Sequence, residues 1–180
     1  MHKKSLIILS LFVIFLTACQ AAPTEAPPQE GEAFELYLVA DQQMAGADLS
    51  NYDLAELPLA EEPIISTEDI ENYLWETHAI NLTSEAYKRI LAIFSGGMPL
   101  SGLPFVILTH NERVYAGAFW SQASSLSFDG VVILQPFDPT NQPLQISLGY
   151  PTEEAFTGED PRNNSQLKDA LEGADLLLEE

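Results

Sequence analysis

The side chains that could do covalent or metal chemistry are few and far apart in this chain. Cys19 is the single cysteine, and beyond the first residues the histidines are His78 and His110. Acyl-transfer catalysis requires a nucleophile, a base and an orienting group, and no G-x-S-x-G motif supplies the nucleophile. A zinc site requires closely spaced ligands, and neither H-x-x-x-H nor H-E-x-x-H occurs. The sequence therefore predicts no catalytic residue, no metal ligand and no cofactor.

Acidic side chains offer an alternative chemistry. The segment 48–53 (DLSNYD) carries oxygen ligands suited to calcium, but it lacks the D-x-[DN]-x-[DN]-G spacing of an EF-hand. The carboxylate pairs Glu61-Glu62 and Glu68-Asp69 could in principle act as acid and base. Because 27 of the 180 residues are acidic, such pairs are expected by chance. A solvated acidic surface is the interpretation that we favour.

Aromatic residues near the two central segments suggest a recognition face. Exposed Trp and Tyr side chains anchor many protein interfaces. We therefore take Trp75, His78, Tyr115 and Trp120 as a candidate interaction surface. The alternative is that these rings fill or cover the core. Exposure of Trp75 beside Trp120 would favour the interface, and separate burial would favour the core.

The first twenty residues account for the lone cysteine. Two lysines precede an apolar run from Leu6 to Ala18. The run is shorter than the roughly 20 apolar residues of a membrane span and is typical of a secretory signal peptide. Its end, Leu16-Thr17-Ala18-Cys19, resembles the lipobox of bacterial lipoproteins, which reads Leu, small residue, Ala or Gly, Cys.

The lipobox resemblance implies that residues 1–18 are a cleaved signal peptide and that Cys19 carries a diacylglyceryl group built from fatty acids such as palmitate. Two or three acyl chains give a stable anchor, whereas one binds reversibly. Cys19 is then an anchor in a lipid bilayer, on the extracytoplasmic face of a bacterial cell or outer membrane. An uncleaved signal anchor, or an ordinary signal peptide with an incidental cysteine, are the alternatives.

Net charge excludes one class of partner. Loss of the signal peptide removes two lysines, so the formal charge moves from −20 to −22. Nucleic-acid binding needs clusters of Lys and Arg at the phosphates, so we expect no nucleic-acid partner. The same charge disfavours adhesion to anionic lipid.

Composition divides the remaining chain into a tether and one domain. Residues 19–32 are rich in Pro, Ala and Glu and lack large apolar side chains, which predicts an extended, disordered tether. Residues 33–180 suit a single domain. Strand and helix patterns are mixed there without a regular βαβ repeat. This predicts an α+β fold with a mostly antiparallel sheet and one or two helices packed on one face.

Local signals place the elements of this domain. A helix is predicted at 84–94, with Thr83 as its N-cap, an apolar face that includes Ile93 and Phe94, and a left-handed Gly96 or Gly97 at its end. A hairpin is predicted from strands 105–109 and 113–120, joined at His110-Asn111. The remaining expectations are strands at 33–40, 63–66 and 143–150, a strand after a turn at Asp129-Gly130, and a closing helix from 165 that Gly173 weakens or ends. Residues 70–75 and 78–82 are interpreted as two strands with a turn at Glu76-Thr77, with a helix over 69–75 as the alternative.

Residues 62–120 also resemble part of a known family. The order of "EEPIISTEDIENY", "NLTSEAYKRI" and "PFVILTHNERVYAGAFW" is similar to the first extracytoplasmic domain of SecD-type protein-export subunits. There a segment of the type L-T-x-E-x-A-x-x-F precedes a hairpin of the type A-I-V-L-D-G-x-V, and here His110-Asn111 replaces the Asp-Gly turn. The resemblance implies a small α+β head domain that makes protein contacts.

These observations predict a membrane-anchored extracytoplasmic lipoprotein whose domain is a non-enzymatic binding or accessory module. Its expected partners are the bilayer, through acylated Cys19, and a protein of the cell envelope. An envelope hydrolase with unrecognised catalytic residues is one alternative. An ion- or solute-capturing lipoprotein is the other.

Overall fold

The computed structural model describes residues 31–41, 43–135 and 143–178. The predicted signal peptide, Cys19 and all of the predicted tether except Gly31 and Glu32 lie outside these residues. The described chain begins against the hairpin turn at His110-Asn111, where the amide of His110 donates to the carbonyl of Glu32 at 2.7 Å. Across the described ranges, every helix is too short or too polar to cross a membrane.

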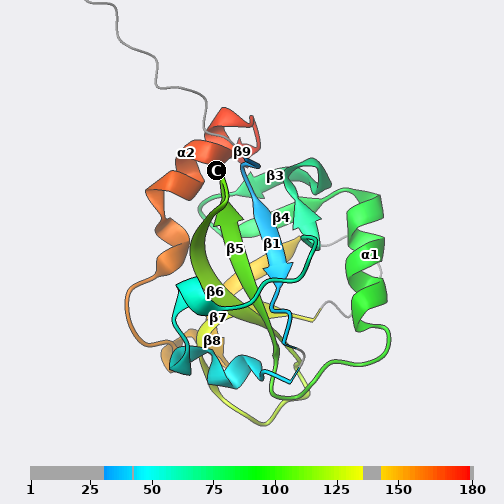
Figure 1. Ribbon diagram of the computed structural model, residues 1–180, viewed down its shortest axis with the longest axis vertical. Coiled ribbons are helices and arrows are strands. Elements are labelled where there is room, and N and C mark those ends of the chain that lie inside the picture. Colours follow the sequence, from blue (N-terminus) through cyan, green and yellow to red (C-terminus); the bar gives the residue numbers. More distant parts are fainter. Residues whose placement is uncertain (1–30, 42, 136–142, 179–180) are drawn as a thin grey trace, which may run out of the picture.

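Nine strands form one mixed sheet in the order β2-β1-β5-β6-β7-β8-β4-β3-β9 (Figure 1). Neighbouring strands are antiparallel except for the pairs β6–β7 and β3–β9. Two α-helices accompany the sheet, and together they give the predicted α+β fold. The strands are β1 (Glu35–Leu38), β2 (Ile65–Ser66), β3 (Ile70–Leu74), β4 (Ala79–Leu82), β5 (Leu103–Thr109), β6 (Glu112–Trp120), β7 (Phe128–Leu134), β8 (Leu144–Tyr150) and β9 (Leu177–Leu178). The helices are α1 (Ser84–Phe94) and α2 (Ser165–Gly173).

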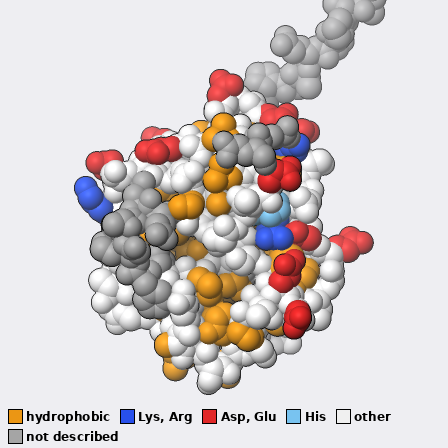
Figure 2. All heavy atoms as spheres, turned by 180° about the vertical axis from the view of Figure 1, so that it is seen from behind, with side chains coloured by type: hydrophobic (Ala, Val, Ile, Leu, Met, Phe, Trp, Pro, Cys, Tyr) orange, Lys and Arg blue, Asp and Glu red, His pale blue; other side chains and the backbone are white. Residues whose placement is uncertain are grey.

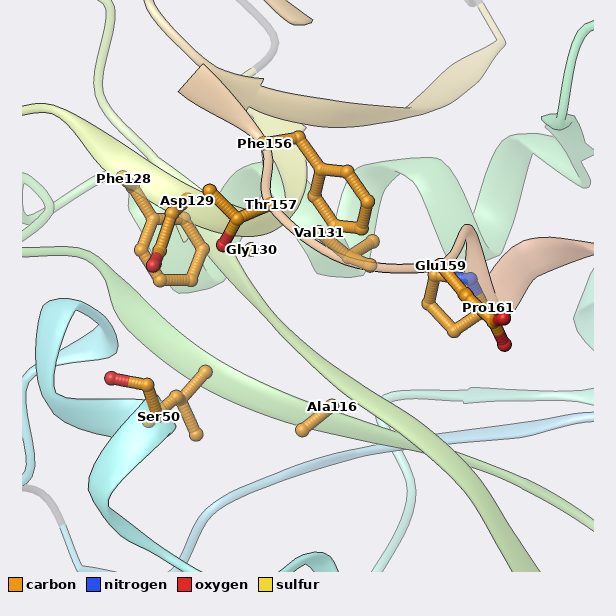
Figure 3. A pocket seen from close by; sticks show the side chains of 11 residues that line it. Ser50, Ala116, Phe128, Asp129, Gly130, Val131, Phe156, Thr157, Glu159 and Pro161 are labelled. Atoms are coloured by element: carbon orange, nitrogen blue, oxygen red, sulfur yellow. The ribbon is translucent and has the colours of Figure 1, made fainter. Parts of the chain in front are cut away.

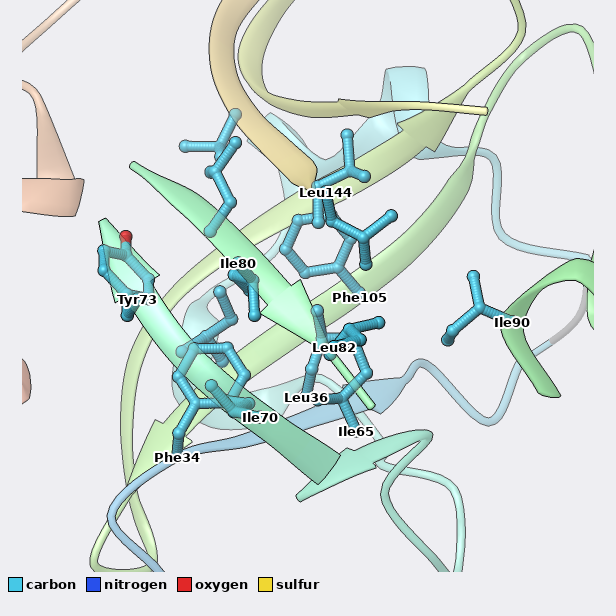
Figure 4. Packing of buried hydrophobic residues seen from close by; sticks show 14 of the residues in the cluster. Phe34, Leu36, Ile65, Ile70, Tyr73, Ile80, Leu82, Ile90, Phe105 and Leu144 are labelled. Carbon is cyan, nitrogen blue, oxygen red and sulfur yellow. The ribbon is translucent and has the colours of Figure 1, made fainter. Parts of the chain in front are cut away.

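The sheet curls so that strands near its two ends face each other across one apolar interior. Phe34, just before β1, and Tyr73 of β3 have ring centroids 6.5 Å apart, although β1 and β3 lie near opposite ends of the strand order. Figure 4 shows side chains from β1, β3, β4 and β5 converging there, with Ile90 of α1 pointing in from the side. We call this set the inner cluster. Leu167 and Leu171 of α2 join the same cluster, so both helices pack on one face of the sheet, as predicted.

A second apolar cluster covers the other face of β5, β6 and β7. Trp120 and Phe128 stack there with ring centroids 4.9 Å apart, and short 3-10 helices at Gly46–Asn51 and Leu54–Glu56 pack over them. We call this set the outer cluster. Because both faces of the central strands are buried, β5 reads in the sequence as a continuous apolar run rather than an alternating one.

Helix α1 forms where its sequence signals place it. The Thr83 hydroxyl accepts a hydrogen bond from the amide of Ala86 at 3.2 Å, which satisfies one of the free amides of the first turn. Gly97, just past the helix, has the predicted left-handed conformation with φ of 91°. The predicted apolar face is wrong at Ile93, which is 38% exposed, whereas Phe94 is buried as expected.

The hairpin and the two short strands are also confirmed. His110 and Asn111 have φ of 48° and 65°, the left-handed geometry that a tight hairpin needs. Residues Ile70–Leu74 form β3 rather than the alternative helix. Asp129-Gly130 is a correction: the pair lies inside β7, where a register irregularity between Phe128 and Val131 takes the place of the predicted turn. The closing helix ends at Gly173, and the short strand β9 that follows was not predicted.

Gly102 tests how tightly the outer cluster is packed. It has φ of 83°, and an added Cβ would lie 2.4 Å from Cε3 of Trp120. Replacing Gly102 by Ala should therefore cost about 2 to 4 kcal/mol in the free energy of unfolding, from left-handed strain and overpacking. Gly96 is a matched control, because an added Cβ there meets nothing within 4 Å.

The Gly96→Ala variant should change stability by less than about 0.5 kcal/mol. Urea unfolding followed by tryptophan fluorescence measures both variants. Equal stability of the two variants would contradict the packing described for Trp120.

Candidate functional site

The four residues predicted as an interaction surface are all buried. The exposed fraction is 9% for Trp75, 7% for His78, 4% for Tyr115 and 0% for Trp120. Trp120 belongs to the outer cluster, whereas Trp75 and Tyr115 belong to the inner one. The expectation of an exposed aromatic patch is therefore corrected in favour of the core alternative. The physical reason is the large apolar area of these rings, which both faces of the sheet take out of water.

His78 nevertheless lies at a polar cluster at the end of the inner cluster. It occupies the turn between β3 and β4 with φ of 50°, and its carbonyl accepts from the amide of Ile146 at 2.9 Å. Its Nδ1 lies 3.4 Å from the hydroxyl of Tyr73, and its ring meets Trp75 edge-on at 5.6 Å. From α2, the Lys168 ammonium lies 5.5 Å from the centroid of Trp75. The turn thus joins β3, β8 and α2.

Two residues that the sequence analysis did not single out complete this cluster. Arg162 and Asp160 lie on the segment 151–164 that leads from β8 to α2. The Arg162 guanidinium donates through Nε and Nη2 to the two carboxylate oxygens of Asp160, at 2.9 and 2.7 Å. Its Nη1 donates to the carbonyl of Ile146 in β8 at 2.8 Å. The pair therefore binds the crossing segment to the sheet.

Burial sets the protonation of the cluster. Burial lowers the pKa of His78, the positive charge of Arg162 lowers it further, and Asp160 and Glu76 partly offset this. Burial raises the pKa of the Tyr73 and Tyr115 hydroxyls. The hydrogen bonds from Arg162 hold the pKa of Asp160 below its usual value. At neutral pH the cluster thus contains a neutral imidazole, two protonated phenols and one ion pair.

This arrangement stabilises structure better than it transfers protons. The Asp160 carboxylate accepts from the backbone amide and side chain of Arg162 and, at 3.3 Å, from Asn163. A carboxylate with so many donors is held in its charged form and has little capacity left for a substrate proton. The Tyr115 hydroxyl is one of three buried side-chain polar atoms without a hydrogen-bond partner in the described part of the chain, together with Oε2 of Glu35 and Nε1 of Trp120.

Two of the acidic residues considered for calcium binding or for acid–base chemistry, Asp53 and Asp69, have structural roles. Asp53 accepts from the amide of Ala55 at 2.9 Å and begins a 3-10 helix. Asp69 accepts from the amide of Ser66 at 3.0 Å and pairs with Arg89 at 2.6 Å. In the described ranges, no three His, Cys, Asp or Glu side chains lie together as metal ligands would.

A cavity of about 330 Å³ lies where β6 and β7 diverge, and residues of both apolar clusters line it (Figure 3). Ala116 of β6 is at its floor, Ser50 lies on one side, and Phe128 and Phe156 lie on the other. Asp129 and Glu159 lie at opposite ends of the cavity in Figure 3. The segment 156–161, which the Arg162 pair holds, supplies one wall. The full lining is Leu49, Ser50, Ala116, Phe128, Asp129, Gly130, Val131, Phe156, Thr157, Glu159 and Pro161.

One sequence signal could have pointed to this region. Asp-Pro-Arg at 160–162 combines an N-cap residue with a proline at the first helical position, and Asp160 does begin the 3-10 helix Pro161–Asn163. Arg162 is also one of the few basic residues of the domain. The cavity itself carries no local signal, because its walls come from segments far apart in the sequence.

Comparisons of the chain with protein-family models, with curated proteins and with solved structures found no significant match. The resemblance of residues 62–120 to SecD-type subunits and the lipobox resemblance of Leu16–Cys19 remain predictions from the sequence.

Arg162 tests the importance of the ion pair. Replacing Arg162 by Met removes the two side-chain hydrogen bonds to the partly buried Asp160 carboxylate and the one to the carbonyl of the buried Ile146. We expect a loss of about 2 to 4 kcal/mol in the free energy of unfolding. The Arg89→Met variant breaks a second ion pair of the described chain, in which the Arg89 side chain is 53% exposed, and should cost about 1 kcal/mol or less. Equal losses in urea unfolding would argue against a special role for Arg162.

His78 predicts a pH dependence of stability. The unfolded chain binds a proton at the ordinary His pKa of about 6.5, whereas the folded chain binds it only at lower pH. The resulting stabilisation is present above pH 6.5 and is lost as the pH falls through the folded-state pKa. The free energy of unfolding should therefore decline between pH 7 and pH 5, and the decline should be smaller in His78→Gln. An unchanged wild-type slope in His78→Gln would contradict this assignment.

Proposed function

We propose that this chain is an extracytoplasmic bacterial lipoprotein whose α+β domain is a non-enzymatic binding module on a lipid anchor. The observation that carries the proposal is the tetrad Leu16-Thr17-Ala18-Cys19 directly after an apolar run of signal-peptide length. A cysteine that carries two or three acyl chains gives stable attachment without a transmembrane helix.

The start of the described domain supports a tether at this point. The Thr109 hydroxyl donates to the carbonyl of Ala33 at 2.8 Å, and His110 contacts Glu32 and Gly31. The chain is therefore fixed to the β5–β6 hairpin from residue 31 onward. Any pull from an anchor on the N-terminal side would act on the central strands rather than on a loose end.

The polar cluster favours binding over catalysis. Its carboxylate, Asp160, is occupied by donors, and its histidine is 7% exposed. A hydrolase needs a base that reaches substrate, and neither residue meets that requirement in this arrangement. The cavity at β6 and β7 instead offers a concave surface for a ligand.

The surface charge is consistent with a domain held in water beside the bilayer. Figure 2 shows Asp and Glu side chains around one face of the molecule with few Lys or Arg among them. A strongly negative domain is repelled by anionic headgroups and stays soluble. A protein partner in the envelope remains part of the proposal.

Cys19 provides the decisive experiment. In a bacterial host supplied with an alkyne-tagged fatty acid, the wild-type chain should incorporate the tag and lose residues 1–18, because the thiol is the acylation site. The Cys19→Ser variant should lose the label completely. Gln20→Ala is the matched control, since it changes the neighbouring residue and leaves the tetrad intact, and it should label like wild type. An unlabelled wild type, or a labelled Cys19→Ser variant, would refute the anchor; gel fluorescence and intact mass measure both.

A further inference from the structure

We infer that the cavity at β6 and β7 is a binding site for a short flexible diammonium compound, an apolar chain with a protonated amine at each end. This inference deepens the proposed function, because it rests on the domain being a binding module and names the class of its ligand. It does not depend on the lipid anchor.

The size and the floor of the cavity suit a small organic molecule. Its volume of about 330 Å³ lies at the lower end of the range for small-molecule sites. Ala116, Val131 and Phe156 give it an apolar middle, and Figure 3 shows their side chains between the two ends. An alkyl chain lying on this surface would leave water without losing a hydrogen bond.

The small residues of the floor keep the cavity open. A Cβ added at Gly130 would lie 2.5 Å from the ring of Phe128. Phe128 is itself fixed by stacking on Trp120. The hollow is therefore preformed by the packing of the outer cluster, and a ligand would not have to open it.

The ends of the cavity are both negative. Asp129 and Glu159 are its ionisable lining residues, and no Lys, Arg or His is among the described residues that line it. Neither carboxylate forms a hydrogen bond or an ion pair within the described part of the chain. Two separated carboxylates with an apolar stretch between them match two separated ammonium groups joined by methylenes.

The hydroxyls of Ser50 and Thr157 add polar positions to the lining of the cavity. Both residues line the cavity, and Thr157 follows Phe156 on the wall that Arg162 holds. An ammonium group has three donors, so a carboxylate and a neighbouring hydroxyl can share it. The wall thus supplies both apolar contact and polar contact.

The test uses the full chain, purified with its anchor in a nonionic detergent at about 150 mM salt, where long-range attraction to the acidic surface is screened. The probe is 1,5-diaminopentane, and binding is followed by NMR shifts of the Gly130 and Ala116 amides in the isotope-labelled protein. We expect saturable binding with Kd on the order of 1 mM. Pentylamine, which lacks the second charge, should bind at least about threefold more weakly.

Charge-neutral variants separate the site from general attraction to a negative protein. Asp129→Asn and Glu159→Gln should each weaken diamine binding about threefold, and together about tenfold. Glu154→Gln, an exposed carboxylate outside the cavity, is the matched control and should change Kd by less than about twofold. All of these positions are exposed, so circular dichroism should confirm that each variant folds.

Three outcomes would overturn the inference. They are equal binding of pentylamine and diaminopentane, equal weakening by Glu154→Gln and the cavity variants, and shifts that never saturate. The ether-containing diamine of the same length, 2,2′-oxybis(ethylamine), tests the apolar middle and should bind more weakly than 1,5-diaminopentane. If the diamine does not bind but Cys19 is labelled by the fatty acid, the cavity inference fails and the lipoprotein proposal stands. If the diamine binds but Cys19 is not labelled, the lipoprotein proposal fails and the cavity inference stands.

Discussion

The guanidinium of Arg162 connects the sheet, one wall of the cavity and the polar cluster around His78. It joins Asp160 on the crossing segment to the Ile146 carbonyl in β8. Another described contact of that segment with the sheet, from the amide of Thr157 to the carbonyl of Asp129, is longer at 3.4 Å. The same segment forms one wall of the cavity, and the same charge adds to the burial that lowers the pKa of His78. Fold, cavity and polar cluster therefore share one ion pair.

Basic side chains are scarce in this chain, and the Arg162–Asp160 pair uses one of them. After the predicted cleavage, the chain has five Lys and Arg residues. Four of them make described contacts inside the domain, and no Lys or Arg is among the described residues that line the cavity. These contacts are Arg89 with Asp69, Arg113 with the carbonyls of Leu54 and Leu57, Arg162 with Asp160, and Lys168 with the ring of Trp75. Cations from solution must supply the remaining compensation, which gives a cationic ligand an electrostatic advantage.

Much of the fold was predictable because its signals are local. Thr83 marks the start of α1, and His110-Asn111 marks a hairpin, since each depends on the conformational preferences of one or two residues. The turn predicted at Asp129-Gly130 was wrong for the same reason. The dipeptide favours a turn locally, but β7 pairs with β8 on both sides of it, so it lies within the strand. Tertiary pairing outweighed a local preference there.

The candidate site was much less predictable, because it depends on distant contacts. Trp75 and Trp120 are of a residue type that is common at interfaces. The curled sheet buries them on different faces, Trp75 in the inner cluster and Trp120 in the outer cluster. Arg162 reaches across to β8, and the cavity joins residues from 49 to 161. Pairing and curvature of this kind leave no mark in a short window of sequence. The two edges of this curled sheet are the strands β2 and β9, and each is two residues long. A long free edge is a template on which another copy can add a strand, and these edges offer room for only a couple of such bonds. Molecules confined to the plane of a membrane, as proposed above, collide often, and such blunt margins would let them crowd together without polymerising.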